Sequence, residues 1–128
     1  MTKAPLNGKT PLISIIDDDE AVLDATARFV RSLGYAAETY SCAEDYLRSG
    51  RLHASDCVIT DLQMPGLSGA DLQARIASNG HRIPVIIMTA YADDAVRKRL
   101  LDAGAFDFLS KPIEGDRLIA SLDKALKH

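Results

Sequence analysis

The chain has 128 residues, of which 47% are hydrophobic and 26% charged, and this is the size and composition of one globular domain. Its net charge of −3 argues against a protein that binds nucleic acid directly, because such proteins are normally basic. Two cysteines are too few for a disulfide framework, and no apolar run approaches the ~18 residues that span a membrane, so we expect a cytoplasmic protein without membrane contact.

The N-terminal part of the chain predicts a leader, a strand and a helix. Residues 1–11 contain two prolines and one glycine and are predicted to be a flexible leader before one domain over residues 12–128. Residues 12–16 are apolar and rich in β-branched side chains, which predicts a strand buried on both faces. Apolar residues then recur at steps of three and four, which predicts an amphipathic helix ended by Gly34. The stripe of this helix consists of Val22, Ala25, Phe29 and Leu33.

The next three elements are shorter. Residues 36–40 predict a strand at the edge of the sheet, because no charged cluster follows it. Residues 43–49 predict a short helix with Ser41 as its N-cap. The apolar run at residues 57–60 predicts another buried strand, with Cys57 as a core residue and not a reactive thiol.

The same alternation continues to the C-terminus. Helical spacing is present at residues 70–79, 96–103 and 119–126, and strand-like runs lie between them at residues 85–88 and 106–109. Five strands alternating with five helices predict an α/β fold, namely a doubly wound parallel sheet with right-handed crossovers and helices on both faces.

Polar side chains follow four of the five predicted strands. Four consecutive acids occupy residues 17–20 after the first strand, Asp61 follows the third, Thr89 the fourth and Lys111 the fifth. Each alone has an ordinary explanation as a residue at a helix start, a turn residue or a solvated lysine. In an open doubly wound sheet, however, ligands bind at the carboxyl ends of the strands, where all four positions meet. Their coincidence predicts a functional site.

The residue types of this site indicate its chemistry. Converging carboxylates repel one another unless a cation joins them. A set of oxygen ligands without histidine or cysteine suits a hard cation, Mg²⁺ or Mn²⁺. The lysine and the threonine suit phosphoryl oxygens, and a carboxylate can act as a nucleophile that forms an aspartyl phosphate. The pattern therefore predicts phosphoryl transfer onto an aspartate.

Four motifs closely resemble the signature of the response-regulator receiver domain of two-component signalling. They are IIDDD at residues 15–19, VITDLQMPG at 58–66, MTA at 88–90 and LSKP at 109–112. The resemblance extends over residues 12–126, and the motifs occur in the family's order. It implies a flavodoxin-like (βα)5 fold with the strand order 2-1-3-4-5.

The resemblance also implies roles for individual residues. Asp61 is expected to accept a phosphoryl group from a phosphohistidine of a sensor histidine kinase or a histidine phosphotransfer protein. Asp18, Asp61 and the backbone carbonyl of Gln63 are expected to bind Mg²⁺ directly, and Asp17 to bind it through water. Lys111 is expected to contact the phosphoryl group. The chain would then catalyse only its own phosphorylation and dephosphorylation and would not otherwise be an enzyme.

Two further residues are implied to form a switch. Thr89 would hydrogen-bond a phosphoryl oxygen, and Phe108 occupies the position of the family's switch aromatic. Their coupling would change the surface formed by the last two helices and the strand between them. Phe108 is equally well explained as an ordinary core aromatic. The bond between Lys111 and Pro112 is expected to be cis.

The sequence departs from the family pattern at three positions. Gln63 stands where several relatives have asparagine, and Tyr91, two residues after Thr89, replaces an acidic residue that some possess. Both side chains flank the path of the attacking water in the family, so bulky Tyr91 is expected to slow dephosphorylation. Phe108 lacks a hydroxyl group, so its switching would work by packing alone. Asp19, the third acid of the motif, is expected to have no role beyond preceding the helix.

Two other functions share parts of this pattern. A haloacid-dehalogenase-like, Mg-dependent phosphatase also uses an aspartate after an apolar strand, but it would have a second aspartate at position 63, which is glutamine. Multiple turnover of a phosphate ester would favour this alternative, and stoichiometric labelling of Asp61 would exclude it. A flavodoxin-like cofactor carrier would need a phosphate-binding loop where four acids stand.

The output of the receiver has more than one explanation. The sequence ends one predicted helix after Pro112, so we expect either a stand-alone receiver with a downstream protein target or the receiver part of a longer, transcriptional regulator with its own output domain. A cluster of charged residues near the last helices supports either a phosphorylation-dependent homodimer or a solvated helix surface. This cluster contains Arg97, Lys98, Arg99, Asp102, Asp107 and Asp116.

Overall fold

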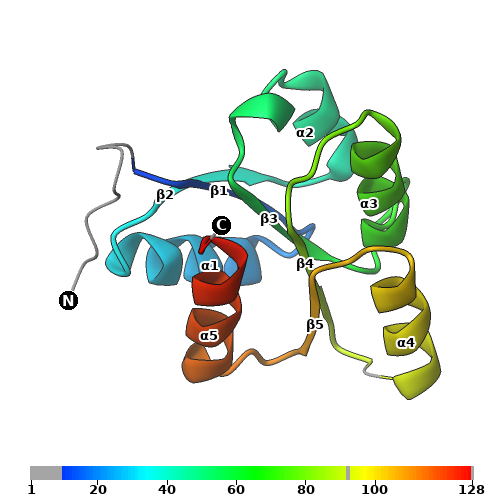
Figure 1. The fold of residues 1–128 in the computed structure, drawn as a ribbon. Helices are drawn as coiled ribbons and strands as arrows, with labels where there is room; N and C mark the ends of the chain where they lie inside the picture. The colour runs from blue at the N-terminus through cyan, green and yellow to red at the C-terminus, as the bar shows by residue number, and fades with distance from the viewer. Residues whose placement is uncertain (1–9, 92, 128) are drawn as a thin grey trace.

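The computed structural model describes residues 10–91 and 93–127 (Figure 1). The predicted flexibility of the leader concerns mainly residues 1–9, which lie outside the described residues. Of the leader, Pro11 is fixed by a hydrogen bond in which its carbonyl accepts the N–H of Ala36 at 3.0 Å. Every helix in the described ranges is too short or too polar to cross a membrane.

The core of the fold is one sheet of five parallel strands in the order β2-β1-β3-β4-β5. This order confirms the predicted doubly wound, flavodoxin-like fold. Because β2 lies at one edge of the sheet, the prediction of an edge strand is also confirmed. The strands are β1 (Leu12–Ile16), β2 (Ala36–Tyr40), β3 (Cys57–Asp61), β4 (Val85–Thr89) and β5 (Asp107–Ser110).

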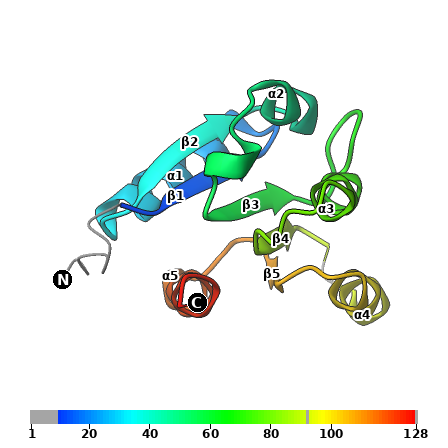
Figure 2. The same cartoon turned by 45° about the horizontal axis from the view of Figure 1, so that its top comes forward.

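Helices cover both faces of the sheet (Figure 2). Helices α1 and α5 bury apolar side chains against one face, and α2, α3 and α4 against the other. A short 3-10 helix, η1, which the sequence did not predict, precedes β3. The helices are α1 (Glu20–Ser32), α2 (Ala43–Arg48), η1 (Leu52–Ala54), α3 (Gly69–Ser78), α4 (Asp94–Asp102) and α5 (Gly115–Ala125).

Burial on both faces explains the apolar strands. All five residues of β1, β3 and β4 are buried. Successive side chains alternate between the faces, so Ile15 packs toward α1 and α5 while Ile16 packs toward α2 and α3. Cys57 is fully buried, and this burial raises the pKa of its thiol to about 12. Its prediction as a core residue is confirmed.

Helix starts match the sequence in part. Asp19 is the N-cap of α1, where its side chain accepts the N–H groups of Ala21 and Val22, as expected of a residue that only precedes the helix. The prediction of Ser41 as N-cap of α2 is wrong. Cys42 holds that position and provides no side-chain hydrogen bond, so α2 depends on its buried residues and not on a cap.

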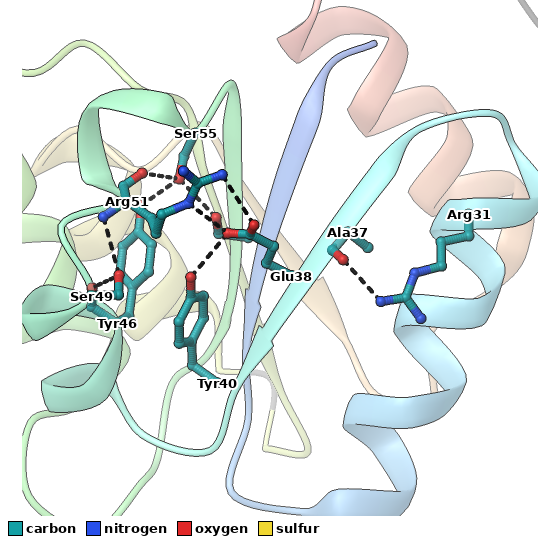
Figure 3. Close-up of polar contacts among 9 residues, drawn as sticks. Arg31, Ala37, Glu38, Tyr40, Tyr46, Ser49, Arg51 and Ser55 are labelled. Carbon is teal, nitrogen blue, oxygen red and sulfur yellow. Dashed lines mark hydrogen bonds and ion pairs between the residues drawn. The ribbon is translucent and has the colours of Figure 1, made fainter.

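Polar contacts beneath α2 anchor this short helix (Figure 3). Tyr46 is fully buried, and its hydroxyl lies 2.7 Å from the Oγ of Ser55, which in turn lies 2.7 Å from the Oγ of Ser14 on β1. Arg51, just after α2, donates from Nε and an Nη atom to both carboxylate oxygens of Glu38 on β2, each at 3.0 Å. The helix and the turn after it are thereby tied to two strands.

Candidate functional site

The carboxyl ends of four strands bring the predicted site residues together. Asp17 directly follows β1, Asp61 ends β3, Thr89 ends β4 and Lys111 directly follows β5. The register of the sheet aligns these ends, and the N–H of Lys111 donates to the carbonyl of Thr89 at 2.7 Å. Parallel pairing therefore assembles groups that are up to 94 residues apart in the chain.

Three carboxylates form the centre of the site. Asp17, Asp18 and Asp61 each offer an oxygen atom, and these atoms lie within 4.8 Å of one another. Asp17 is fully buried and Asp61 nearly so, whereas Asp18 is exposed. The Oδ1 atom of Asp17 accepts the N–H of Asp19 at 2.9 Å. This hydrogen bond fixes the Asp17 side chain, whereas the side chain of Asp18 faces solvent.

Lys111 bridges two of the three carboxylates. Its Nζ atom lies 2.9 Å from Oδ2 of Asp17 and 3.1 Å from Oδ1 of Asp61. Burial alone would lower the pKa of Lys111, but the two aspartates outweigh it and hold the pKa above its ordinary value. The bond between Lys111 and Pro112 is cis, as expected.

The environment of Asp61 opposes its ionisation. Burial raises the pKa of this carboxyl, the hydrogen bond from Lys111 lowers it, and the charges of Asp17 and Asp18 raise it further, so the net direction is upward. Without a second cation, the site holds three carboxylates and one ammonium group, and negative charge is in excess. This excess fits a divalent cation with oxygen ligands.

The two predicted switch residues lie inside the molecule. Thr89 is buried, and its Oγ1 atom accepts the N–H of Tyr91 at 3.1 Å, so the hydroxyl proton is still available to an acceptor. Phe108 is buried in the cluster between the sheet and helices α2, α3 and α4. Tyr91 is 73% exposed.

The loop between β3 and α3 carries Gln63, whose side chain is exposed. Leu62, at the start of the loop, donates its N–H to the carbonyl of Met88 at 2.8 Å. Sequence reasoning missed one residue that contacts this loop, Glu44 on α2, whose Oε2 atom accepts the N–H of Leu67 at 3.1 Å. A contact between residues 23 positions apart leaves no local pattern that would have revealed it.

The family model of the response regulator receiver domain matches residues 13–123. The chain belongs to this family. Among its relatives, the response regulator protein TodT of Pseudomonas putida is 35% identical over 122 residues, which cover 95% of this chain and 54% of TodT. The transcriptional regulatory protein FixJ of Bradyrhizobium diazoefficiens is 34% identical over 115 residues, covering 90% of this chain and 56% of FixJ.

Solved structures agree with this assignment. The crystal structure of a response regulator receiver protein from Burkholderia phymatum is 39% identical, has a TM-score of 0.79, and is matched over 91% of this chain and 95% of that one. The receiver spans about half the length of the curated relatives it matches. The family match decides against the alternative of a haloacid-dehalogenase-like phosphatase.

Proposed function

We propose that this receiver accepts a phosphoryl group on Asp61 from the phosphohistidine of a sensor histidine kinase or a histidine phosphotransfer protein. The observation that carries the proposal is the Nζ atom of Lys111, held 2.9 Å from Asp17 and 3.1 Å from Asp61. A fixed cation beside the acceptor offsets the charge that a phosphoryl group brings. In this proposal the chain catalyses only its own phosphorylation and dephosphorylation.

The same carboxylates suit a magnesium ion. Asp18, Asp61 and the backbone carbonyl of Gln63 would hold Mg²⁺, or Mn²⁺, with Asp17 acting through a water molecule. The support is the donor set, three carboxylates with oxygen atoms within 4.8 Å of one another. When bound, the cation offsets the charge of the carboxylates and of the phosphoryl oxygens.

The transfer step needs little beyond alignment and charge. An oxygen of Asp61 attacks the phosphorus atom while the P–N bond of the donor histidine breaks, and the electron pair of that bond stays on the imidazole nitrogen. Lys111 exchanges its contact with Asp61 for one with a phosphoryl oxygen and keeps its bond to Asp17. Thr89 donates a hydrogen bond from its hydroxyl group to another phosphoryl oxygen. Its Oγ1 atom already accepts the N–H of Tyr91, which leaves the hydroxyl hydrogen free for this bond.

The signal then reaches the surface formed by α4, β5 and α5. Movement of Thr89 toward the phosphoryl group opens space near β5, and Phe108 responds by repacking, since it has no hydroxyl group to bond. The charged cluster predicted on this surface is partly satisfied within the chain: Lys98 pairs with Asp102 at 3.1 Å, and Asp107 accepts the hydroxyl of Ser121 at 2.8 Å. These pairings favour a solvated surface over a charge-paired homodimer.

The relatives support an output in transcription. TodT is a response regulator protein and FixJ a transcriptional regulatory protein, and the match to this chain covers only 54% of TodT and 56% of FixJ. We infer that this receiver controls either an output domain of the same polypeptide or a separate target protein. The histidine-containing donor and this target are its partners in the cytoplasm.

Acetyl phosphate with Mg²⁺, followed by intact-mass spectrometry, tests the proposed function. Wild-type protein should gain the mass of one phosphoryl group, while Asp61→Asn and wild type without Mg²⁺ should not. Size-exclusion chromatography of the same samples shows whether phosphorylation causes dimerisation. An equal mass gain in Asp61→Asn would mean that another residue is the acceptor, and absence of any gain in wild type would contradict the proposal.

A further inference from the structure

Glu44 on α2 contacts the loop that follows Asp61. Its Oε2 atom accepts the N–H of Leu67 at 3.1 Å. Its Oε1 atom is buried and has no hydrogen-bond partner among the described residues. The carboxylate lies directly against Gly66, where a Cβ atom would collide with it, and Gly66 has a φ of 78°, which side-chain-bearing residues rarely adopt. The loop is therefore shaped around this carboxylate.

The rest of the loop has few other anchors. Its start is fixed by the bond from Leu62 to Met88, and its end by the N–H of Gly69, which donates to the carbonyl of Leu62 at 2.8 Å. Between these points, at residues 63–67, Glu44 is the only group that hydrogen-bonds the loop in the part of the chain that the structure describes. Met64 and Leu67 also pack against the core, so the hydrogen bonding of this segment, but not its packing, depends on a single side chain.

The carboxylate is held on a firm support. Helix α2 has six residues and no side-chain cap, so it would not be stable by itself. The buried Tyr46, two residues after Glu44 on the same helix, is bonded to Ser55 (Figure 3), and Ser55 is bonded in turn to Ser14 of β1. The backbone amides of Glu44 itself and of Leu67 hold the pKa of the Glu44 carboxyl below its ordinary value. Glu44 thus presents a charged acceptor from a fixed position.

We propose that Glu44 is a positioning residue for the metal site. By holding residues 63–67 in one conformation, it keeps the backbone carbonyl of Gln63 available to the divalent cation. This inference rests on the proposed function, because it concerns the loop that would supply a ligand to Mg²⁺. It gives α2 an indirect part in metal binding, although α2 contributes no residue to the acidic cluster.

The test compares Glu44→Ala with Asp45→Ala, a matched control on the neighbouring, exposed residue of the same helix. Labelling by acetyl phosphate is measured across a range of MgCl₂ concentrations. Glu44→Ala should raise the Mg²⁺ concentration for half-maximal labelling about tenfold, as is typical when a group supporting a metal ligand is lost. Saturating Mg²⁺ should restore most of the rate, whereas a general loss of structure would lower the rate at all concentrations.

Two other variants separate the hydrogen bond to Leu67 from the negative charge of Glu44. Glu44→Gln keeps an oxygen acceptor and should bind Mg²⁺ nearly as wild type does. Glu44→Asp keeps the charge but withdraws it from Leu67 by one methylene group, so it should resemble Glu44→Ala. This variant also carries the test if Glu44→Ala does not fold.

Two measurements do not depend on phosphorylation. Isothermal titration with MgCl₂ alone should show the same loss of affinity, and NMR hydrogen exchange in Mg-free buffer should show that the Leu67 amide exchanges faster in Glu44→Ala than in Asp45→Ala. If wild type binds Mg²⁺ but is never labelled, the proposed function fails while Glu44 is still tested. Equal Mg²⁺ affinities and equal Leu67 exchange in folded Glu44→Ala and Asp45→Ala would overturn the inference.

Discussion

Within the residues that the structure describes, Lys111 is the single cationic side chain paired with the three clustered carboxylates, and of these it contacts Asp17 and Asp61. Asp18, the exposed member of the cluster, adds negative charge near Asp61 without a bond to this ammonium group. Burial and these like charges raise the pKa of Asp61 despite its bond to Lys111. In the absence of Mg²⁺, ionised Asp61 is therefore a source of instability.

The raised pKa of Asp61 predicts how the stability of the protein depends on pH. A carboxyl whose pKa is raised on folding binds its proton more tightly in the folded state, so its stabilising effect is complete below the unfolded pKa and is lost as the pH rises through the folded pKa. We expect Asp61→Asn to melt at a higher temperature than wild type at neutral pH in Mg-free buffer. The difference should shrink as the pH falls toward the ordinary aspartate value of 3.8.

Differential scanning calorimetry from neutral pH to pH 4 measures this trend. Asp24→Asn is a suitable control, because Asp24 is an exposed carboxylate on α1 that pairs with Arg28. It removes the same charge without touching the site, so it should not raise the melting temperature. A melting temperature of Asp61→Asn at or below that of wild type at neutral pH would contradict the explanation.

Tyr91 offers a second prediction at the scale of one residue. It is the large hydrophobic side chain most exposed to solvent in the described ranges, and its backbone N–H bonds Thr89. We expect Tyr91→Ala to lose the phosphoryl group several times faster than wild type, because a smaller side chain opens the path of water to Asp61. The backbone bond to Thr89 is kept in this variant. Decay is followed by intact mass after acetyl phosphate is removed, and an unchanged lifetime would show that Tyr91 does not shield the site.

At the scale of elements, strands were easier to predict than helix surfaces. The apolar runs that became β1, β3 and β4 are buried on both faces, so their composition alone indicated their place in the sheet. In α1 the buried residues are Leu23, Ala27 and Val30, whereas Ala25 of the predicted stripe is exposed. The helix contains apolar residues at neighbouring positions, and only packing against the sheet selects which stripe is buried.

The candidate site was predictable where it depends on strand ends. Asp17, Asp61, Thr89 and Lys111 occupy positions that parallel pairing must bring together once the strand order is known. Glu44 was not predictable, because its contact with Leu67 depends on how α2 packs and on the path of a loop. The missed Cys42 cap has the same origin, since buried contacts and not a local hydrogen bond fix the start of α2.

At the scale of the whole molecule, the fold concentrates charge at one edge of the sheet. Four strands deliver three carboxylates, one ammonium group and the hydroxyl of Thr89 to a single place, although the net charge of the chain is only −3. The packed core on both faces keeps these groups in position without help from the ligand. A cation that binds only the folded state must then stabilise the entire domain.

We therefore expect MgCl₂ to raise the melting temperature of wild type. At a concentration about 100 times the dissociation constant, binding adds about 2.7 kcal/mol to the free energy of unfolding. Asp18→Asn should show a smaller rise in melting temperature. In MgCl₂, Asp61→Asn should no longer melt at a higher temperature than wild type, as it is expected to do in Mg-free buffer. Potassium chloride at equal ionic strength controls for screening, which acts on all exposed charges alike. Equal gains in wild type and Asp18→Asn would place the cation elsewhere, whereas a gain confined to wild type would locate it at the carboxylates that meet beside β1 and β3.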